Sequence, residues 1–542
     1  MLRDLAYHFR RGDPVATVAV GLLILVAVGF LVYASSFGNR LFWDDDDFFL
    51  KNSYVHEWRY FPRYFSENVI AGTGLNSNYW RPVLLTAFAL EWHLWDTWAP
   101  GWHVTNTFFH VADAVLLFGL LLVLFRRRGL ALITALVFLV HPAQTEAVSY
   151  ANSLGDSLSV FFMLCGALFY HQARTDPKQN RWAFWAGAFL AYPLALGSKE
   201  TAIIYPALLW LMELYMGRGR SWVRRFLEPV RRLWPWLLAA GGYILLRATA
   251  LNFQNTFNLY NAQNAFTQSV WVRLLTFCRS LVTYVTLIFW PAELHMERSQ
   301  PFVTALGSDP LTILGIILLV GLAVLILFTY RRLPEISFGA VWFLIGLAPT
   351  SNIAVPINGV FYEHWLYLPL AGASFAIFSG LTHLGKIIPP LWTRRIGAGA
   401  LAVILVALAT RTVLRNREWR DPITFYNQTL RYSPGSYRIW NNLGMAYADS
   451  NQPTEAERAY RQAIQLDPTV AVAFHNLGNL KRGAGDYPAA EENYRHALEL
   501  DPDFLFTYPQ LAEVYYREGK CAEAEAVLAN YAARAAQKQQ HP

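Results

Sequence analysis

Residues 15–34 read VATVAVGLLILVAVGFLVYA, a run of 20 residues without a charge that follows Arg10 and Arg11. Such a run has the length that an α-helix needs to cross a lipid bilayer. It is too long for the apolar part of a typical signal peptide, and no small-residue cleavage site stands out. We therefore predict an uncleaved first spanning helix.

Composition places the rest of the chain in the same class. Of 542 residues, 54% are hydrophobic and 15% are charged, whereas soluble proteins carry about 25% charged residues. The mean hydropathy is +0.24. These values exclude a soluble globular enzyme, a disordered chain and a disulfide scaffold. Cys165, Cys278 and Cys521 lie far apart, without metal-ligand spacing.

The basic residues predict how the helices are oriented. Eleven further apolar runs lie near residues 104–125, 129–146, 154–171, 182–197, 201–216, 234–250, 268–290, 310–330, 336–350, 365–384 and 396–413. Basic clusters in the connecting loops mark the cytoplasmic side. They fall at Arg126–Arg128, at Arg174, Lys178 and Arg181, at Arg218–Arg232, at Arg331–Arg332 and at Lys386–Arg395. This placement also explains the net charge of +7 without a nucleic-acid partner.

If the N-terminus is inside and all twelve runs cross, Arg331–Arg332 and Lys386–Arg395 lie outside. All basic clusters lie inside if one run before Arg331 does not cross. Run 268–290 contains Arg273 and Arg279, and a charge at mid-membrane costs about 2.5–3.5 kcal/mol. We therefore predict eleven spans, with 268–290 in the outer interface or re-entrant. The Trp-rich stretch 80–98 in the first outer loop is expected to lie along the membrane surface.

A 34-residue period begins near residue 434. It relates Pro434, Pro468 and Pro502, and the same spacing relates Leu443, Leu477 and Leu511, Trp440, Phe474 and Tyr508, and Ala456, Ala490 and Ala524. Helix–turn–helix units of this length and pattern are tetratricopeptide repeats. We predict an all-α chain with a membrane domain at 1–415, a linker at 416–435 and three repeats at 436–537. The alternation of spans puts the repeats outside.

Polar residues gather in the predicted outer loops. Asp44–Asp47 are four adjacent carboxylates, which suit a general base or a site for Mg²⁺ or Mn²⁺, although a solvated acidic run is the simpler interpretation. Arg81 stands among aromatic residues and could hold a lipid phosphate or merely extend to the interface.

Three further clusters share this face. They are His141 with Glu146 and Asp156, Lys199 with Glu200, and Glu363 with His364. Each also has a structural explanation, as a helix end, a neighbouring ion pair or an interfacial anchor. Together they place carboxylates, cations and imidazoles on one side, which suits a reaction on a lipid-phosphate substrate.

The order of these motifs resembles the transmembrane and tetratricopeptide-repeat protein O-mannosyltransferases and their bacterial relatives. The resemblance covers about residues 40–535. It rests on an Asp pair followed by Asn52, Arg81-Pro82, His103 and His110, the run HPAQTEAV at 141–148, SKE at 198–200, PTSNI at 349–353, EHWLYLP at 363–369 and the repeats.

The resemblance implies a GT-C fold and an inverting glycosyltransferase that uses a polyprenyl-phosphate sugar. Two departures stand out. Leu154 occupies the place of an arginine that the family often carries before Asp156, and the acidic run is longer than a pair. By the spacing to Asn52, Asp44 and Asp45 match the pair. The protein-mannosyl branch is thought to work without metal, so we do not favour a metal at Asp44–Asp47.

Chemistry assigns roles to these residues. The phosphate leaving group needs charge stabilisation, for which we name Arg81 and Lys199 with His141 and His364 assisting; Glu200 and Glu363 belong to the same clusters. The acceptor hydroxyl needs a base, for which we name Asp44 or Asp45, with Asp156 and Glu146 as positioning residues. Lys199→Ala and Asp45→Asn are each expected to abolish transfer.

The predicted function is transfer of one sugar, mannose or a similar one, to a hydroxyl, Ser or Thr of a polypeptide that the repeats could present. The rivals are a membrane-anchored tetratricopeptide scaffold for envelope assembly and a flippase for lipid-linked sugars. The short repeat array favours a bacterial inner membrane with periplasmic repeats. The alternative is the endoplasmic reticulum with lumenal repeats.

Overall fold

The computed structural model describes residues 14–175, 181–217, 222–253, 264–298, 300–357, 359–385 and 390–540. The chain divides into two compact units, Met1–Arg420 and Asp421–Pro542. Every regular element in these described ranges is a helix, which confirms the predicted all-α class.

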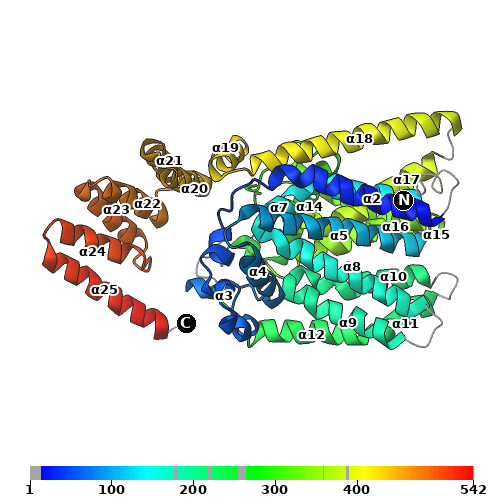
Figure 1. Cartoon of the computed structure of the whole chain (residues 1–542), viewed down its shortest axis with the longest axis horizontal. Helices are drawn as coiled ribbons and strands as arrows, with labels where there is room; N and C mark the ends of the chain where they lie inside the picture. The colour runs from blue at the N-terminus through cyan, green and yellow to red at the C-terminus, as the bar shows by residue number, and fades with distance from the viewer. Residues whose placement is uncertain are drawn as a thin grey trace. The chain divides into compact units, whose positions relative to one another are not determined.

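The first unit is a bundle of long helices that lie side by side (Figure 1). Its longer members are α2 (Pro14–Tyr33), α5 (Ala99–Phe125), α6 (Arg128–Val140), α8 (Leu154–Thr175), α9 (Arg181–Ser198), α10 (Tyr205–Met216), α11 (Trp222–Arg232), α12 (Trp234–Ala248), α14 (Val270–Phe289), α15 (Pro310–Arg332), α16 (Pro334–Leu347), α17 (Tyr367–Leu384) and α18 (Pro390–Glu418).

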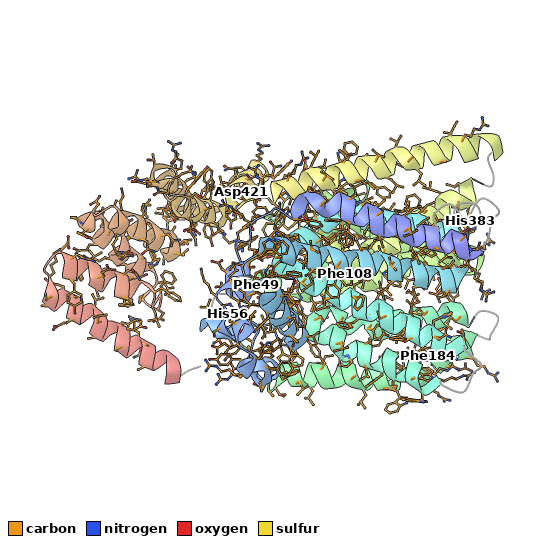
Figure 2. All side chains as sticks on the ribbon, viewed as in Figure 1. Phe49, His56, Phe108, Phe184, His383 and Asp421 are labelled. Atoms are coloured by element: carbon orange, nitrogen blue, oxygen red, sulfur yellow. The ribbon has the colours of Figure 1, made fainter. Side chains whose placement is uncertain are left out.

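The bundle has two ends with different chemistry. At one end, which we call the Glu213 end, Arg174 and Arg232 pair with Glu213, and Arg127 pairs with Glu335. At the other, the Asp156 end, the predicted outer loops meet. Figure 2 shows Phe49 and His56 at the Asp156 end, and His383 and Phe184 toward the Glu213 end.

By length and composition alone, seven described helices could each cross a membrane, or eight if α6 and α7 (Thr145–Ser149), bent by 54°, form one broken span. Several apolar helices are therefore present, and the number eleven stays a prediction.

Helix α14 corresponds to the run expected not to cross. Near its start, Arg273 donates to the Ile353 carbonyl oxygen at 3.3 Å, and near its end the Ile288 carbonyl oxygen accepts from His141 Nε2 at 3.1 Å. Ile353 and His141 both lie at the Asp156 end, so both ends of α14 are there. Length and composition would allow α14 to cross, but these contacts favour the prediction that it does not.

The predicted basic clusters gather as expected where they are described. Arg127, Arg174 and Arg232 lie at the Glu213 end, and α15 brings Arg331 and Arg332 there, since Tyr330 contacts the Tyr215 ring. Arg10, Arg11, Lys178, Arg218 and Lys386 lie outside the described residues.

Helix α18 closes the bundle against its first helix. Asn416 Nδ2 donates to the Val32 carbonyl oxygen at 3.1 Å, and its Oδ1 accepts from Ser149 at 2.9 Å. Asn39 in turn donates to the Asn416 carbonyl oxygen at 3.1 Å. Asn416 is fully buried. It thereby joins the first and last described helices of the unit, α2 and α18, at the Asp156 end.

The stretch 80–98 forms helix α4 (Pro82–Trp95). Leu84, Leu85 and Phe88 are buried, whereas Leu90 and Leu94 are exposed. This helix is therefore apolar on its outer side as well, which is typical of a segment that lies on a membrane surface.

The second unit contains the predicted repeats as three helix pairs. They are α20 (Tyr437–Asp449) with α21 (Pro453–Leu466), α22 (Ala471–Gly483) with α23 (Tyr487–Leu500), and α24 (Thr507–Arg517) with α25 (Cys521–Gln540). A side chain at Gly444 would come within 2.6 Å of the Tyr460 ring, and one at Gly478 within 2.6 Å of the Tyr494 ring. The glycines therefore allow the paired helices to approach closely.

The predicted linker 416–435 is largely helical. Helix α18 continues to Glu418, and α19 (Pro422–Tyr432) packs on α20. Asp421 caps α19, since its carboxylate accepts from the Thr424 amide at 2.8 Å. The division between the units falls after Arg420, inside the predicted linker.

Candidate active site

Two ion pairs connect loops that are far apart in sequence at the Asp156 end. Lys199 Nζ lies 2.6 Å from Asp156 Oδ2, and both side chains are about nine-tenths buried. Arg81 binds Glu200 through two parallel hydrogen bonds of 2.9 and 2.6 Å. Sequence reasoning named all four residues but could not assign their partners.

The local backbone explains why Lys199 meets Asp156. Asp156 lies in the first turn of α8, directly after Gly155, and a side chain at Gly155 would lie 3.1 Å from the Ser198 carbonyl oxygen and 3.2 Å from Leu84. Lys199 has an extended backbone just before the short helix η7 (Glu200–Ile204). The glycine therefore allows the start of α8 to approach the segment that carries the lysine.

A third pair lies between α7 and the turn η9 (Glu363–Leu366). His364 Nδ1 lies 2.7 Å from Glu146 Oε1, and the His364 amide donates to Glu146 Oε2 at 3.1 Å. Glu146 is buried. Both of its oxygens are used, so its role is to fix the position of His364.

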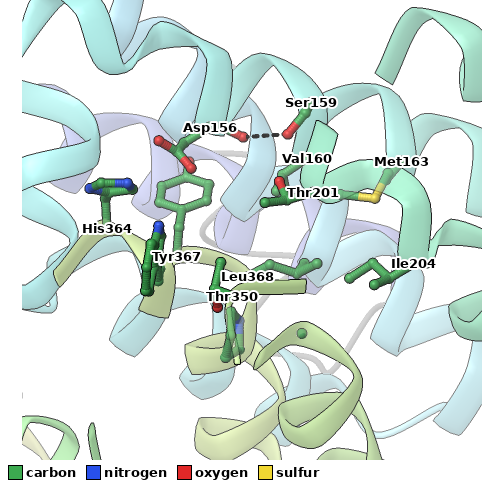
Figure 3. A pocket seen from close by; sticks show the side chains of 13 residues that line it. Asp156, Ser159, Val160, Met163, Thr201, Ile204, Thr350, His364, Tyr367 and Leu368 are labelled. Atoms are coloured by element: carbon green, nitrogen blue, oxygen red, sulfur yellow. Dashed lines mark hydrogen bonds between the residues drawn. The ribbon is translucent and has the colours of Figure 1, made fainter. Parts of the chain in front are cut away.

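Asp156 and His364 line a single pocket (Figure 3). Its cavity volume is about 30 Å³. The sequence-predicted residues Lys199 and Glu146 stand directly behind Asp156 and His364. The remaining lining residues are Ser159, Val160, Met163, Thr201, Ile204, Gly346, Thr350, Trp365, Tyr367, Leu368 and Pro369.

Electrostatics hold the Arg81–Glu200 pair in its ionised form. Burial alone would raise the pKa of Glu200, but the charge and hydrogen bonds of Arg81 outweigh it and lower that pKa to about 2. Burial opposes the positive charge of Arg81, yet Glu200 raises the pKa of Arg81 above its ordinary value. In this arrangement Arg81 is already occupied by a carboxylate.

The acidic run Asp44–Asp47 is more structural than predicted. Asp45 is 1% exposed, and its two oxygens accept from the amides of Phe42 and Asn152 at 2.9 and 3.0 Å. Burial raises the pKa of Asp45 well above its ordinary value, against the two amide hydrogen bonds. Asp46 pairs with the exposed Lys51. Asp45 therefore ties two loops together, and Asp44, half-buried, is the more accessible of the matched pair.

The structure gives no support to a metal at this run. In the described part of the chain, no group of three or more His, Cys, Asp or Glu residues is arranged to hold an ion. The contacts of Asp45 and Asp46 explain this, because one carboxylate is bound to backbone amides and the other to a lysine.

Two other predicted phosphate ligands are engaged elsewhere. His141 Nδ1 accepts from the Ala143 amide, and its Nε2 donates to the Ile288 carbonyl oxygen of α14, so both ring nitrogens already have partners. Glu363 accepts from the His295 amide at 2.7 Å and from Arg298 at 3.2 Å. The structure does not bring these two side chains to the pocket.

Sequence reasoning missed several lining residues. Tyr367, Thr350, Thr201 and Ser159 belong to segments already noted, but they carry no charge and so gave no signal of their own. Leu154, which stands where the family often has an arginine, is fully buried in an apolar cluster. It offers no contact to a donor.

Fold and site together define an integral membrane protein with a tetratricopeptide-repeat region. The family model of the tetratricopeptide repeat matches residues 435–503, which covers the first two predicted repeats. A solved structure, the crystal structure of MamA, is 16% identical and covers 31% of this chain and 94% of its own, with a TM-score of 0.22.

The chain is similar to proteins named protein O-mannosyl-transferases. F38B6.6 of Caenorhabditis elegans is 26% identical, over 82% of this chain and 62% of its own length. TMTC3 of Mus musculus is 23% identical, over 80% of this chain and 50% of its own length. TMTC4 of Homo sapiens is 25% identical, over 81% of this chain and 65% of its own length. The predicted resemblance is thereby confirmed, and the chain spans about half to two thirds of the length of these relatives.

Proposed function

We propose that this protein is a membrane glycosyltransferase that moves one sugar, mannose or a similar one, from a polyprenyl phosphate to Ser or Thr of a polypeptide. The observation that carries the proposal is the pocket with Asp156 and His364 in its wall and Lys199 and Glu146 paired behind them. The names of the similar proteins support transfer to protein.

The reaction needs one bond formed and one broken. The acceptor oxygen attacks the anomeric carbon from the side opposite the phosphate, so the configuration inverts. The bond between that carbon and the phosphate oxygen breaks, and its electrons leave with the polyprenyl phosphate. The proton of the acceptor hydroxyl passes to a carboxylate and then to water.

Asp156 is our first candidate for that carboxylate, because it lines the pocket and one ion pair holds it in place. Asp44 is the alternative from the acidic run. Asp45 is a weaker candidate than its spacing suggested, since both of its oxygens already accept backbone hydrogen bonds.

Lys199 and Arg81 are the candidates to stabilise the leaving phosphate, with His364 assisting. A fixed cation that meets charge developing in the transition state is usually the largest single contribution to such a reaction. In the structure these cations pair with Asp156 and Glu200. The donor phosphate would therefore share Lys199 with Asp156.

The test is transfer of labelled mannose from polyprenyl-phosphate mannose to a Ser/Thr peptide by the full chain in lipid nanodiscs. Asp156→Asn and His364→Ala should each lower the rate at least about a hundredfold. The matched control is Glu57→Gln, an exposed carboxylate paired with Arg59, which should keep the wild-type rate. Full activity of Asp156→Asn and His364→Ala would contradict the assignment.

The repeats would present the acceptor polypeptide. Deletion of residues after 434 should impair transfer to protein more than hydrolysis of the donor, because only the former needs the acceptor to be held. Equal loss of both would argue against this role. A membrane-anchored scaffold, the second candidate, should survive Asp156→Asn without any loss of assembly.

The proposed location is a bacterial inner membrane with the Asp156 end and the repeats in the periplasm. The alternative is the endoplasmic reticulum, with both in the lumen. A reporter fused just after Pro291 tests the topology on which this rests: a cytoplasmic signal would mean that α14 crosses the membrane.

A further inference from the structure

Three polar side chains lie buried behind the pocket, between α5 and α17. His110 and Asp113 are fully buried, and Tyr367, which lines the pocket, is 2% exposed. Ionisable residues inside a spanning segment are costly, so their presence points to a function. The roles proposed above use none of these three residues.

The three side chains are in direct contact. Tyr367 Oη lies 2.7 Å from Asp113 Oδ2 and 2.8 Å from His110 Nδ1. His110 Nε2 lies 3.1 Å from the Leu139 carbonyl oxygen. All three distances are those of hydrogen bonds.

The number of protons in this group follows from its donors and acceptors. A carbonyl oxygen only accepts, so His110 Nε2 must carry a hydrogen, and in a neutral imidazole Nδ1 is then an acceptor. The Tyr367 hydroxyl has a single hydrogen. With an ionised Asp113 and a neutral His110, that hydrogen could serve only one of its two neighbours. The group therefore holds one more proton.

Two arrangements provide that proton. In the first, Asp113 is a neutral acid that donates to Tyr367, Tyr367 donates to His110 Nδ1, and His110 donates to Leu139. In the second, Asp113 is a carboxylate and His110 an imidazolium, which separates two charges in a buried site. A buried charge costs much more than a buried neutral polar group.

The surroundings favour the neutral arrangement. Asp113 Oδ1 is buried without a hydrogen-bond partner, which a neutral carbonyl oxygen tolerates better than an ionised carboxylate. The titratable groups that interact with Asp113 or Tyr367 from neighbouring elements include the Tyr33 hydroxyl, the Cys165 thiol and the Asp156 carboxylate, which is itself paired with Lys199. None of these three is a cation that would stabilise a carboxylate.

We propose that Asp113 is a neutral carboxylic acid and that Asp113, Tyr367 and His110 form one directed hydrogen-bond relay that fixes Tyr367 as a wall of the pocket. Asp113 and His110 are then positioning residues, since they reach the pocket through Tyr367. The protonation state of Asp113 does not depend on the proposed function. Only the expected effect on transfer rests on the proposed function.

Infrared difference spectroscopy of the full chain in nanodiscs tests the protonation state. The carbonyl band of a protonated carboxyl group should be lost in Asp113→Asn. The matched control is Asp156→Asn, in which the band should persist because Asp156 is paired with Lys199. Tyr367→Phe keeps the ring but removes the acceptor of the acid, so the band should shift. An unchanged band in Asp113→Asn or Tyr367→Phe would overturn the proposal.

Conservative replacement tests the direction of the relay. An asparagine amide at 113 can donate to Tyr367 as the acid does, whereas leucine of similar size cannot. Asp113→Asn should keep the wild-type unfolding temperature and transfer rate. Asp113→Leu should lower kcat at least about tenfold, because a displaced pocket wall misplaces the substrate. Equal impairment of the two variants would overturn the relay.

If the wild-type chain shows no transfer, the proposed function fails but the relay does not. The infrared band and the unfolding temperatures still decide the protonation state and the direction of the hydrogen bonds, since neither measurement requires a substrate.

Discussion

The two ends of the helical bundle both contain a buried carboxylate paired with a cation, Glu213 at one and Asp156 at the other. These two carboxylates differ in the number of donors that bind them. Glu213 is bound by Arg174, by Arg232 at 2.9 Å and by the Tyr170 hydroxyl at 2.9 Å. Asp156 has one described ion-pair partner, Lys199, and lines a pocket. A carboxylate with a full set of donors has a structural role, whereas one with a single partner beside a pocket is available to a substrate.

The largest expected effect is on transfer at the Asp156 end. Lys199→Ala should lower the rate about a hundred- to a thousandfold, because one fixed cation that stabilises the leaving group is removed. The assay is labelled-mannose transfer in nanodiscs, normalised to folded protein. Lys51→Ala, which removes an exposed lysine paired with Asp46, is the control and should leave the rate unchanged. Wild-type activity in Lys199→Ala would erase the proposed difference between the ends.

The next effect is on stability at the Glu213 end. Glu213→Gln should lower the free energy of unfolding by about 2–3 kcal/mol, because Arg174 and Arg232 lose their carboxylate; the partial exposure of both arginines reduces the full cost of breaking a buried pair. Thermal unfolding in detergent measures this. The transfer rate per folded molecule should stay at the wild-type value. A lost transfer rate with unchanged stability would mean that Glu213 has a catalytic role and not a structural one.

Asp45→Asn distinguishes structure from catalysis inside the Asp156 end. One of the two backbone hydrogen bonds to Phe42 and Asn152 would lose its acceptor, which should cost about 1 kcal/mol of stability. Transfer by the folded fraction should fall by less than about tenfold. A loss of a hundredfold or more at unchanged stability would restore Asp45 as the base named from the sequence.

The smallest expected effect is a change in the pH dependence of unfolding, because the Glu200 side chain is 39% exposed and solvent screens its ion pair with Arg81. The pKa of Glu200 is lowered to about 2 from an ordinary value of 4.5. A lowered carboxyl pKa stabilises the fold above the ordinary value, and this stabilisation is lost as the pH falls from 4.5 toward 2. Unfolding temperatures measured across that window should fall more steeply for the wild type than for Glu200→Gln. Parallel curves would mean that the Arg81–Glu200 pair does not contribute to the stability of the fold.

Much of the fold could be predicted from the sequence, because apolar length and a 34-residue period are local properties. The repeats follow from the spacing of Pro434, Pro468 and Pro502, and the paired helices are found where that spacing placed them. The linker was harder to predict. We did not predict a helix there, although Asp421 followed by Pro422 is a helix-start signal.

The candidate site could be predicted only in part, because partner choice depends on the fold. Lys199 was named beside Glu200, its neighbour in sequence, but its described ion pair is with Asp156, 43 residues away. His141 is a titratable residue in the motif HPAQTEAV, yet one of its ring nitrogens accepts from the turn after Pro142 and the other donates to Ile288 on α14. Tyr367 lies in the motif EHWLYLP but was not named as a site residue, because an uncharged aromatic residue at a helix start is also typical of an interfacial anchor.

The closure of the bundle by Asn416 has a consequence for biosynthesis. The carbonyl of Val32 and the hydroxyl of Ser149 find their partner in a residue that is translated hundreds of positions later. The Val32 carbonyl therefore lacks this partner until nearly the whole unit is made. A ribosome that stalls before residue 416 would leave a nascent chain whose spans are inserted but whose Asp156 end is still open, a state that quality-control proteases could recognise.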